Sequence, residues 1–210
     1  QVSGSLSNGQ IVVNSTGVGI VRLLLNGVTI TSSTSAAIKV VAADEVMVHL
    51  NAGTTSRLTD GATRASTDEA NAALHSQADL TVAGTGSLTV TGNNADGIAS
   101  TDGLVIAAGT ITATSVDEAI RGKNYLVVNS GSVTVTAGGD GLKSDHDSDA
   151  TKGYVSIAGG TVSCTTCSGS AKELRSNPER SAGCRATSRA YASWKAASFQ
   201  GSRSVYRNTS

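Results

Sequence analysis

The chain has 210 residues and no net charge at pH 7, and its aromatic residues are one Phe, one Trp and four Tyr. A balanced charge argues against nucleic acid or an anionic membrane as the main partner. No apolar run approaches the ~20 residues needed to span a bilayer. Because the chain starts at Gln1 rather than Met, its lack of a signal peptide is compatible with an export signal removed upstream.

A repeat organises most of the chain. Each unit has a short apolar alternation, a turn that ends in Gly, and a second alternation of Thr or Ser with apolar residues. The clearest units start at Asp79, Gly103, Tyr125 and Tyr154. An apolar landmark follows the first three units at a spacing of 22 residues, namely Ile98, Ile120 and Leu142. A fixed period near 20 residues without a helix pattern is typical of a solenoid.

The alternation also predicts which side chains face the core. The first inward column is Leu88, Ile111, Val133 and Val162, and the second is Val90, Ala113, Val135 and Cys164. Cys164 is therefore expected to be a small core residue rather than a metal ligand. We predict an all-β fold, a parallel β-helix of about seven coils over residues 1–166, with a looser excursion at residues 51–71.

The repeat stops near Cys164, and the composition changes with it. Residues 1–170 contain eight Lys/Arg and fourteen Asp/Glu, whereas residues 171–210 contain eight Lys/Arg and two Glu. We therefore separate residues 1–166 from an atypical basic segment, 167–210. Three interpretations of this segment stay open: a cap on the solenoid, a disordered tail, or the translated frameshift of lost coils.

A surplus acidic loop interrupts the repeat after Leu142. The next unit starts seven residues later than the earlier spacing requires, and the extra residues fall within DHDSDATKG. The alternating residues Asp145, Asp147 and Asp149 resemble the ligand spacing of calcium loops, in which the cation collects about 6–8 oxygens. A solvated acidic corner without an ion is the alternative.

Acidic residues also stand two positions before each landmark, at Asp96, Glu118 and Asp140. In a parallel β-helix such residues lie about 4.8 Å apart, where like charges repel by roughly 3 kcal/mol at an effective dielectric constant of 20. A basic column follows the landmarks by one residue and comprises Lys39, His75, Arg121 and Lys143. The two columns indicate either simple alternation of opposite charges or a strip suited to an acidic sugar polymer.

Three stretches carry a family resemblance: DEANAALHSQADLTVAGTGSLTVTGNNADGIASTDGLVI, DEAIRGKNYLVV and GGDGLKSDHDSDATKGYVSIAGGTV. They are similar to a bacterial family of extracellular carbohydrate-binding proteins. The resemblance covers about residues 1–166 and implies a right-handed parallel β-helix similar to that of pectate lyases, an extracellular or cell-surface location, and bound calcium. It also implies binding of plant cell-wall polysaccharide, polygalacturonate in particular.

The resemblance assigns roles to individual residues. The implied calcium ligands are Asp140, Asp145, Asp147 and Asp149, followed by Asp96 and Glu118. The residues implied to face uronate carboxylates are Arg121, Lys123, Lys143 and Lys152.

The expected function is therefore non-catalytic, calcium-assisted binding of an acidic plant polysaccharide. A calcium-dependent lyase is the alternative, in which the metal acidifies a proton beside the uronate carboxylate and Arg or Lys removes it. The outward threonine columns permit a third hypothesis, an ice-binding or structural surface solenoid, although Thr is common on exposed strands.

Overall fold

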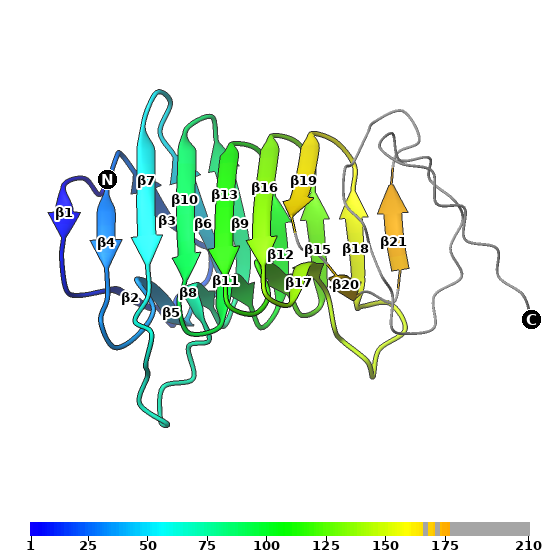
Figure 1. The fold of residues 1–210 in the computed structure, drawn as a ribbon, viewed down its shortest axis with the longest axis horizontal. Helices are drawn as coiled ribbons and strands as arrows, with labels where there is room; N and C mark the ends of the chain where they lie inside the picture. Colours follow the sequence, from blue (N-terminus) through cyan, green and yellow to red (C-terminus); the bar gives the residue numbers. More distant parts are fainter. Residues whose placement is uncertain (166–167, 171–172, 177–210) are drawn as a thin grey trace, which may run out of the picture.

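The computed structural model describes residues 1–165, 168–170 and 173–176. Within them the chain forms strands and no helix, and the strands make three parallel sheets of seven strands each. Successive strands pass from one sheet to the next, so each circuit of the chain adds one layer to a parallel β-solenoid (Figure 1). Six complete coils end at Ile157, and β19 begins a seventh. The predicted fold class is confirmed.

Each coil contributes one strand to each sheet, and the bounds are as follows. The first sheet contains β1 (Ser5–Leu6), β4 (Thr29–Thr31), β7 (Thr55–Thr59), β10 (Ser87–Gly92), β13 (Thr110–Ser115), β16 (Ser132–Ala137) and β19 (Thr161–Thr165). The second contains β2 (Ile11–Asn14), β5 (Ile38–Ala42), β8 (Ala72–Ser76), β11 (Asp96–Ser100), β14 (Ile120–Gly122), β17 (Asp140–Lys143) and β20 (Ser168–Ser170). The third contains β3 (Ile20–Leu25), β6 (Glu45–Leu50), β9 (Asp79–Gly84), β12 (Gly103–Ile106), β15 (Tyr125–Val128), β18 (Tyr154–Ile157) and β21 (Glu173–Ser176).

The inward side chains of all three sheets form one continuous core of Leu, Ile, Val and Ala. Leu88, Ile111 and Val133 lie in register on successive coils and are buried, as the alternation predicts. Burial of one such side chain contributes about 1.5–3 kcal/mol. Cys164 continues the second inward column opposite Val135 and packs against the core, and it is disulfide-bonded.

The short turns between the third and first sheets depend on glycine. Gly131 has a φ of +94°, and a Cβ at this position would lie 2.3 Å from the carbonyl oxygen of Gly109 in the preceding coil. Both the left-handed backbone and the close approach of the coils exclude a larger residue. The turn glycine of the repeat is therefore a requirement of the stacking itself.

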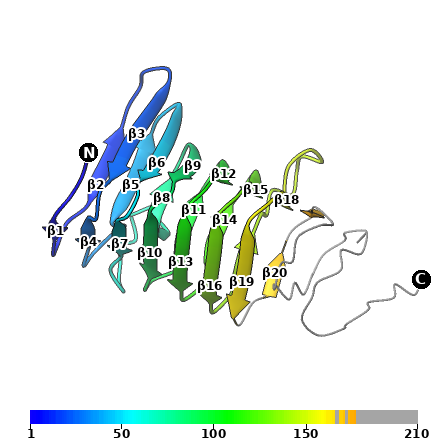
Figure 2. The ribbon, with the colours of Figure 1, turned by 90° about the horizontal axis from the view of Figure 1, so that it is seen from above.

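Two excursions project beyond the second sheet on the same side of the solenoid (Figure 1). Residues 60–71 lead into β8, and residues 144–153 follow β17, so β8, β11, β14 and β17 of the second sheet lie between them in the stack of coils, whose order Figure 2 shows from above. A looser excursion was expected at residues 51–71, but residues 55–59 form the regular strand β7, so the excursion is confined to residues 60–71. It is held by an ion pair between Asp60 and Arg64, whose side chains are 0% and 6% exposed.

The strand pattern continues past the expected boundary at residue 166. β20 pairs with β17 and β21 pairs with β18, so the described strands extend to Ser176. The three interpretations of the segment after residue 166 otherwise concern residues outside the described part of the chain. Among the described residues there is no helix with the length and apolar character that a membrane crossing requires.

Candidate functional site

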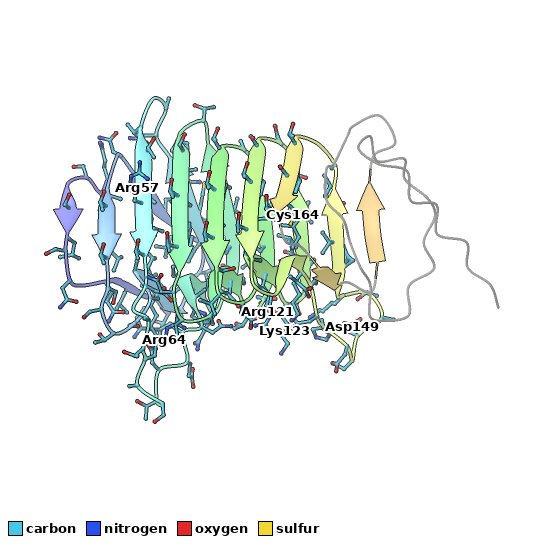
Figure 3. All side chains as sticks on the ribbon, viewed as in Figure 1. Arg57, Arg64, Arg121, Lys123, Asp149 and Cys164 are labelled. Carbon is cyan, nitrogen blue, oxygen red and sulfur yellow. The ribbon has the colours of Figure 1, made fainter. Side chains whose placement is uncertain are left out.

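The predicted basic column runs along the outer face of the second sheet. Strand register places Lys39 beside His75, His75 beside Ala99, Ala99 beside Arg121, and Arg121 beside Lys143. The column is therefore interrupted once, at Ala99, because β11 has no basic residue there. Figure 3 shows Arg121 at the edge of the solenoid from which the excursions project.

The predicted acidic ladder lies at the corner where the chain enters the same sheet. Asp96 and Glu118 are buried, and each lies next to the basic residue of the next coil. A guanidinium nitrogen of Arg121 lies 3.8 Å from Asp96, and the ammonium group of Lys143 forms an ion pair with Glu118. Acids and bases therefore alternate diagonally, which relieves part of the repulsion within the ladder.

The remaining repulsion is relieved by a proton. Burial, together with a hydrogen bond to Glu118 and the charge of Glu118, raises the pKa of Asp96 to about 8. Burial alone would also raise the pKa of Glu118, but its hydrogen bonds with Asp96 and Lys143 lower it. Asp96 is accordingly protonated at neutral pH and shares its proton with an ionised Glu118. The side-chain amide of Asn71 also donates to Asp96, at 2.9 Å.

A third carboxylate completes this corner. Asp96, Asp117 and Glu118 each offer one oxygen, and these oxygens lie within 4.8 Å of one another. Asp117 is exposed, and its pKa is raised by partial loss of hydration and by a hydrogen bond with Glu118, with a further contribution from the charge of Asp140. We refer to Asp96, Asp117 and Glu118 as the carboxylate trio. Among the described residues it is the group with the geometry of a cation site.

The aspartates of the surplus loop lie in separate surroundings. Asp145 accepts hydrogen bonds from Arg121, with its Oδ2 3.1 Å from Nε and 3.0 Å from Nη2. Asp147 is exposed. Asp149 accepts two hydrogen bonds from Thr151, which lower the pKa of its carboxyl.

The structure thus does not gather Asp140, Asp145, Asp147 and Asp149 into one group of the kind the trio forms. The assignment of calcium to these four residues stays a prediction. Asp140 itself is buried at the start of β17, next to the trio along the ladder.

The predicted cationic residues fall into two classes. Arg121 is held in an ion pair with Asp145 of the surplus loop, and Lys143 is held in one with Glu118 of the acidic corner. Lys123 is exposed and Lys152 is half-buried, and neither makes an ion pair with another described residue. Lys123 and Lys152 are therefore the pair available to an external anion.

Comparison with known proteins gives the family of the chain. The family described as "Carbohydrate-binding domain-containing protein" matches residues 1–175. The chain belongs to this family. A solved structure titled "polysaccharide lyase-like protein from C. thermocellum, Gadolinium derivative" superposes with a TM-score of 0.78 at 29% identity, covering 93% of this chain and 84% of that one. The search of curated proteins gave no match.

This carbohydrate-binding family member also has the hydroxyl face on which the third hypothesis rests. Thr89, Thr112 and Thr134 lie in register on the first sheet. Arg57 occupies the same column one coil earlier and is exposed, so it ends the run of threonines (Figure 3). An ice-binding role for this face stays a prediction.

Two features of the site were missed from the sequence. Asp117 directly precedes Glu118, so the sequence shows two consecutive acidic residues at this position of the acidic ladder. That pair could have indicated a third carboxylate at the corner. His75 belongs to the basic column, yet it is buried. Burial lowers its pKa to about 4, so at neutral pH it contributes no charge to the column. No pattern in the repeat signals that burial; in the structure, Oδ1 of Asn71, at the end of the excursion, lies 3.0 Å from Nδ1 of His75.

Proposed function

We propose that this carbohydrate-binding protein binds acidic plant cell-wall polysaccharide of the polygalacturonate type outside the cell, with calcium as a bridging ion and without cleaving the chain. The observation that carries the proposal is the placement, at the two ends of the second-sheet strands, of the carboxylate trio and of two cationic side chains that have no ion-pair partner among the described residues, Lys123 and Lys152. Free ammonium groups attract uronate carboxylates, and carboxylate oxygens are the ligands that calcium prefers.

The carboxylate trio fits a hard divalent cation. Asp96 and Glu118 hold a proton between two buried carboxyl groups, and this proton reduces their negative charge. A cation bound at this position would neutralise the same negative charge in place of the proton. Three carboxylates supply fewer ligands than the 6–8 oxygens that calcium collects, which leaves coordination positions for water or for a uronate of the polymer. The structural neighbour was studied as a gadolinium derivative, and gadolinium is likewise a hard cation.

An extracellular location is part of the proposal. The polymer lies outside the plant cell, and the disulfide bond of Cys164 is typical of oxidising compartments.

Polygalacturonate binding is tested by affinity electrophoresis and calorimetry. We expect the protein to be retarded in gels that contain polygalacturonate and not in gels that contain a neutral glucan, with weaker retardation when calcium is chelated. Because the attraction is electrostatic, retardation should fall as the salt concentration rises. Equal mobility in the two gels would contradict the proposed function.

A calcium-dependent lyase is the second candidate, because the structural neighbour is titled polysaccharide lyase-like. Removal of a proton beside the uronate carboxylate requires a base with a pKa near the working pH. Burial opposes protonation of Lys143, but its hydrogen bond to Glu118 and the nearby carboxylates prevail and raise its pKa, which disfavours this role. Arg121 would have to leave the carboxylate of Asp145, to which it is bound at 3.0 Å. Release of unsaturated product from polygalacturonate, followed by ultraviolet absorbance, would establish the lyase instead.

Calcium binding should stabilise the fold. A cation that binds only the native state adds RT ln(1 + [L]/Kd) to the free energy of unfolding, or about 2.7 kcal/mol at a hundredfold excess over Kd. We expect calcium to raise the melting temperature of the wild type, and we expect the variant Asp96→Asn/Asp117→Asn to lose that increase.

The matched control for this prediction is Asp145→Asn/Asp147→Asn/Asp149→Asn, which removes the acids of the surplus loop. This variant should keep the calcium response if the trio is the site. Loss of the response in the loop variant alone would assign the ion to the loop instead. A wild-type melting curve that is unchanged by chelator would contradict the calcium site at either place.

A further inference from the structure

The two aromatic residues of the solenoid touch each other on its outside. Tyr125 and Tyr154 are the only Phe, Tyr or Trp residues among residues 1–165. They begin consecutive strands of the third sheet and lie in register. Their rings are stacked, with centroids 5.8 Å apart and planes inclined by 19°. Both residues are half-buried, so neither belongs to the core, which is aliphatic throughout.

The position of the Tyr125 ring is determined by its neighbours. The ring extends over the preceding coil at Gly103, where a Cβ would lie 2.0 Å from its Cζ. Its hydroxyl donates to Oδ1 of Asp79 at 3.2 Å, and the same oxygen accepts the backbone N–H of Gly103 at 2.8 Å. The stack therefore has an anchored end, and Tyr154 extends it by one coil.

Each tyrosine follows a lysine by two residues, in the segments Lys123-Asn-Tyr125 and Lys152-Gly-Tyr154. The two segments are joined, because the N–H of Gly153 donates to the carbonyl of Asn124 at 2.6 Å. The surplus loop that supplies Lys152 is also tied to the first segment, through a hydrogen bond of 3.0 Å from the His146 N–H to the Lys123 carbonyl. The residues that carry the two rings and the two ammonium groups are thus brought together at one corner.

We propose that the Tyr125–Tyr154 stack is the platform on which a uronate residue of the polymer rests, with Lys123 and Lys152 binding uronate carboxylates beside it. One face of a pyranose ring presents C–H groups, which pack against the face of an aromatic ring, and tyrosine combines such a surface with a polar edge. A uronate adds a carboxylate at the rim of the sugar ring, where an ammonium group can pair with it. The inference rests on the proposed function and names the part of the surface that contacts the sugar.

The test is the affinity for oligogalacturonate, measured by calorimetry. We expect Tyr154→Ala to weaken binding about tenfold or more, and Lys123→Met/Lys152→Met to weaken it similarly while reducing its dependence on salt. Tyr125→Phe keeps the ring and removes only the bond to Asp79, so its affinity should stay within about twofold. Arg57→Met removes one positive charge from a different sheet and should have equally little effect.

A second measurement does not depend on variants that fold. In the wild type with ring-labelled tyrosine, the resonances of Tyr125 and Tyr154, assigned with Tyr125→Phe, should shift when oligogalacturonate is added. Wild-type binding that leaves these resonances unmoved would overturn the platform and leave the proposed function standing, as would undiminished affinity in folded Tyr154→Ala. A wild type that does not bind oligogalacturonate would overturn both.

Discussion

Replacing Asp60 by alanine is expected to lower the free energy of unfolding by about 3–5 kcal/mol. The side chains of Asp60 and Arg64 are almost completely buried and form an ion pair. Asp60 also accepts a hydrogen bond from the backbone N–H of Asn93, and Arg64 donates to the carbonyl of Ala70. Removal of Asp60 leaves the guanidinium buried without its counter-charge. Chemical denaturation of wild type and variant measures the difference.

Two controls separate this loss from a general effect on the excursion. Glu69→Ala changes an exposed acid of the same segment and should alter stability by no more than about 0.5 kcal/mol. Asp60→Ala/Arg64→Met removes both charges and should be more stable than Asp60→Ala alone, because no unpaired charge remains buried. A loss below about 1 kcal/mol in Asp60→Ala would show that the excursion is as loose as its sequence suggests.

The second large effect is a loss of stability in acid that depends on His75. Burial lowers the pKa of His75 from 6.5 to about 4, and the positive charges of Arg64, Lys39 and Arg121 add to this effect while Asp68 opposes it. Between these two values the unfolded chain binds a proton that the folded chain does not. The part of the free energy of unfolding that is linked to His75, about 3 kcal/mol, is therefore fully present above pH 6.5. It is lost as the pH falls toward 4.

The measurement compares the free energy of unfolding at pH 7 and pH 4. Wild type should lose about 3 kcal/mol more than His75→Gln over this range, since the variant has no group to titrate there. His146→Gln, in the surplus loop, is the matched control and should follow the wild type. Parallel curves for wild type and His75→Gln would contradict the buried neutral histidine.

The columns of the site could be predicted because a solenoid converts sequence period into position. Residues one period apart lie on neighbouring coils, so the register of Arg121 with Lys143 follows from counting along the chain. Tyr154 lies beside Tyr125 although it follows by 29 residues, because the surplus loop adds seven residues to the period without changing the register of the next strand. Wherever the period holds, residues that are distant in sequence can be predicted to be neighbours in space without any knowledge of the packing.

The rule fails where the chain leaves the period. Asp145, Asp147 and Asp149 alternate in sequence, but they belong to no strand, so their spacing does not bring their carboxylates together. Asp145 pairs with Arg121 of the preceding coil instead. In the excursion at residues 60–71, the burial of Asp60 likewise has no counterpart in another coil from which it could be inferred.

The amino-acid sequence by itself therefore determined the parallel β-solenoid, its aliphatic core and the acidic and basic columns, because each depends on a short repeat whose hydrogen bonds and packing recur from coil to coil. Only the tertiary structure decided the electrostatics at the corner. The proton shared by Asp96 and Glu118 and the neutral state of His75 depend on how far each group is removed from water, whereas the inclusion of Asp117 depends on the distances between the carboxylate oxygens. The burial of a group is determined by all the surrounding coils and loops together, so it cannot be inferred from the sequence of a single repeat.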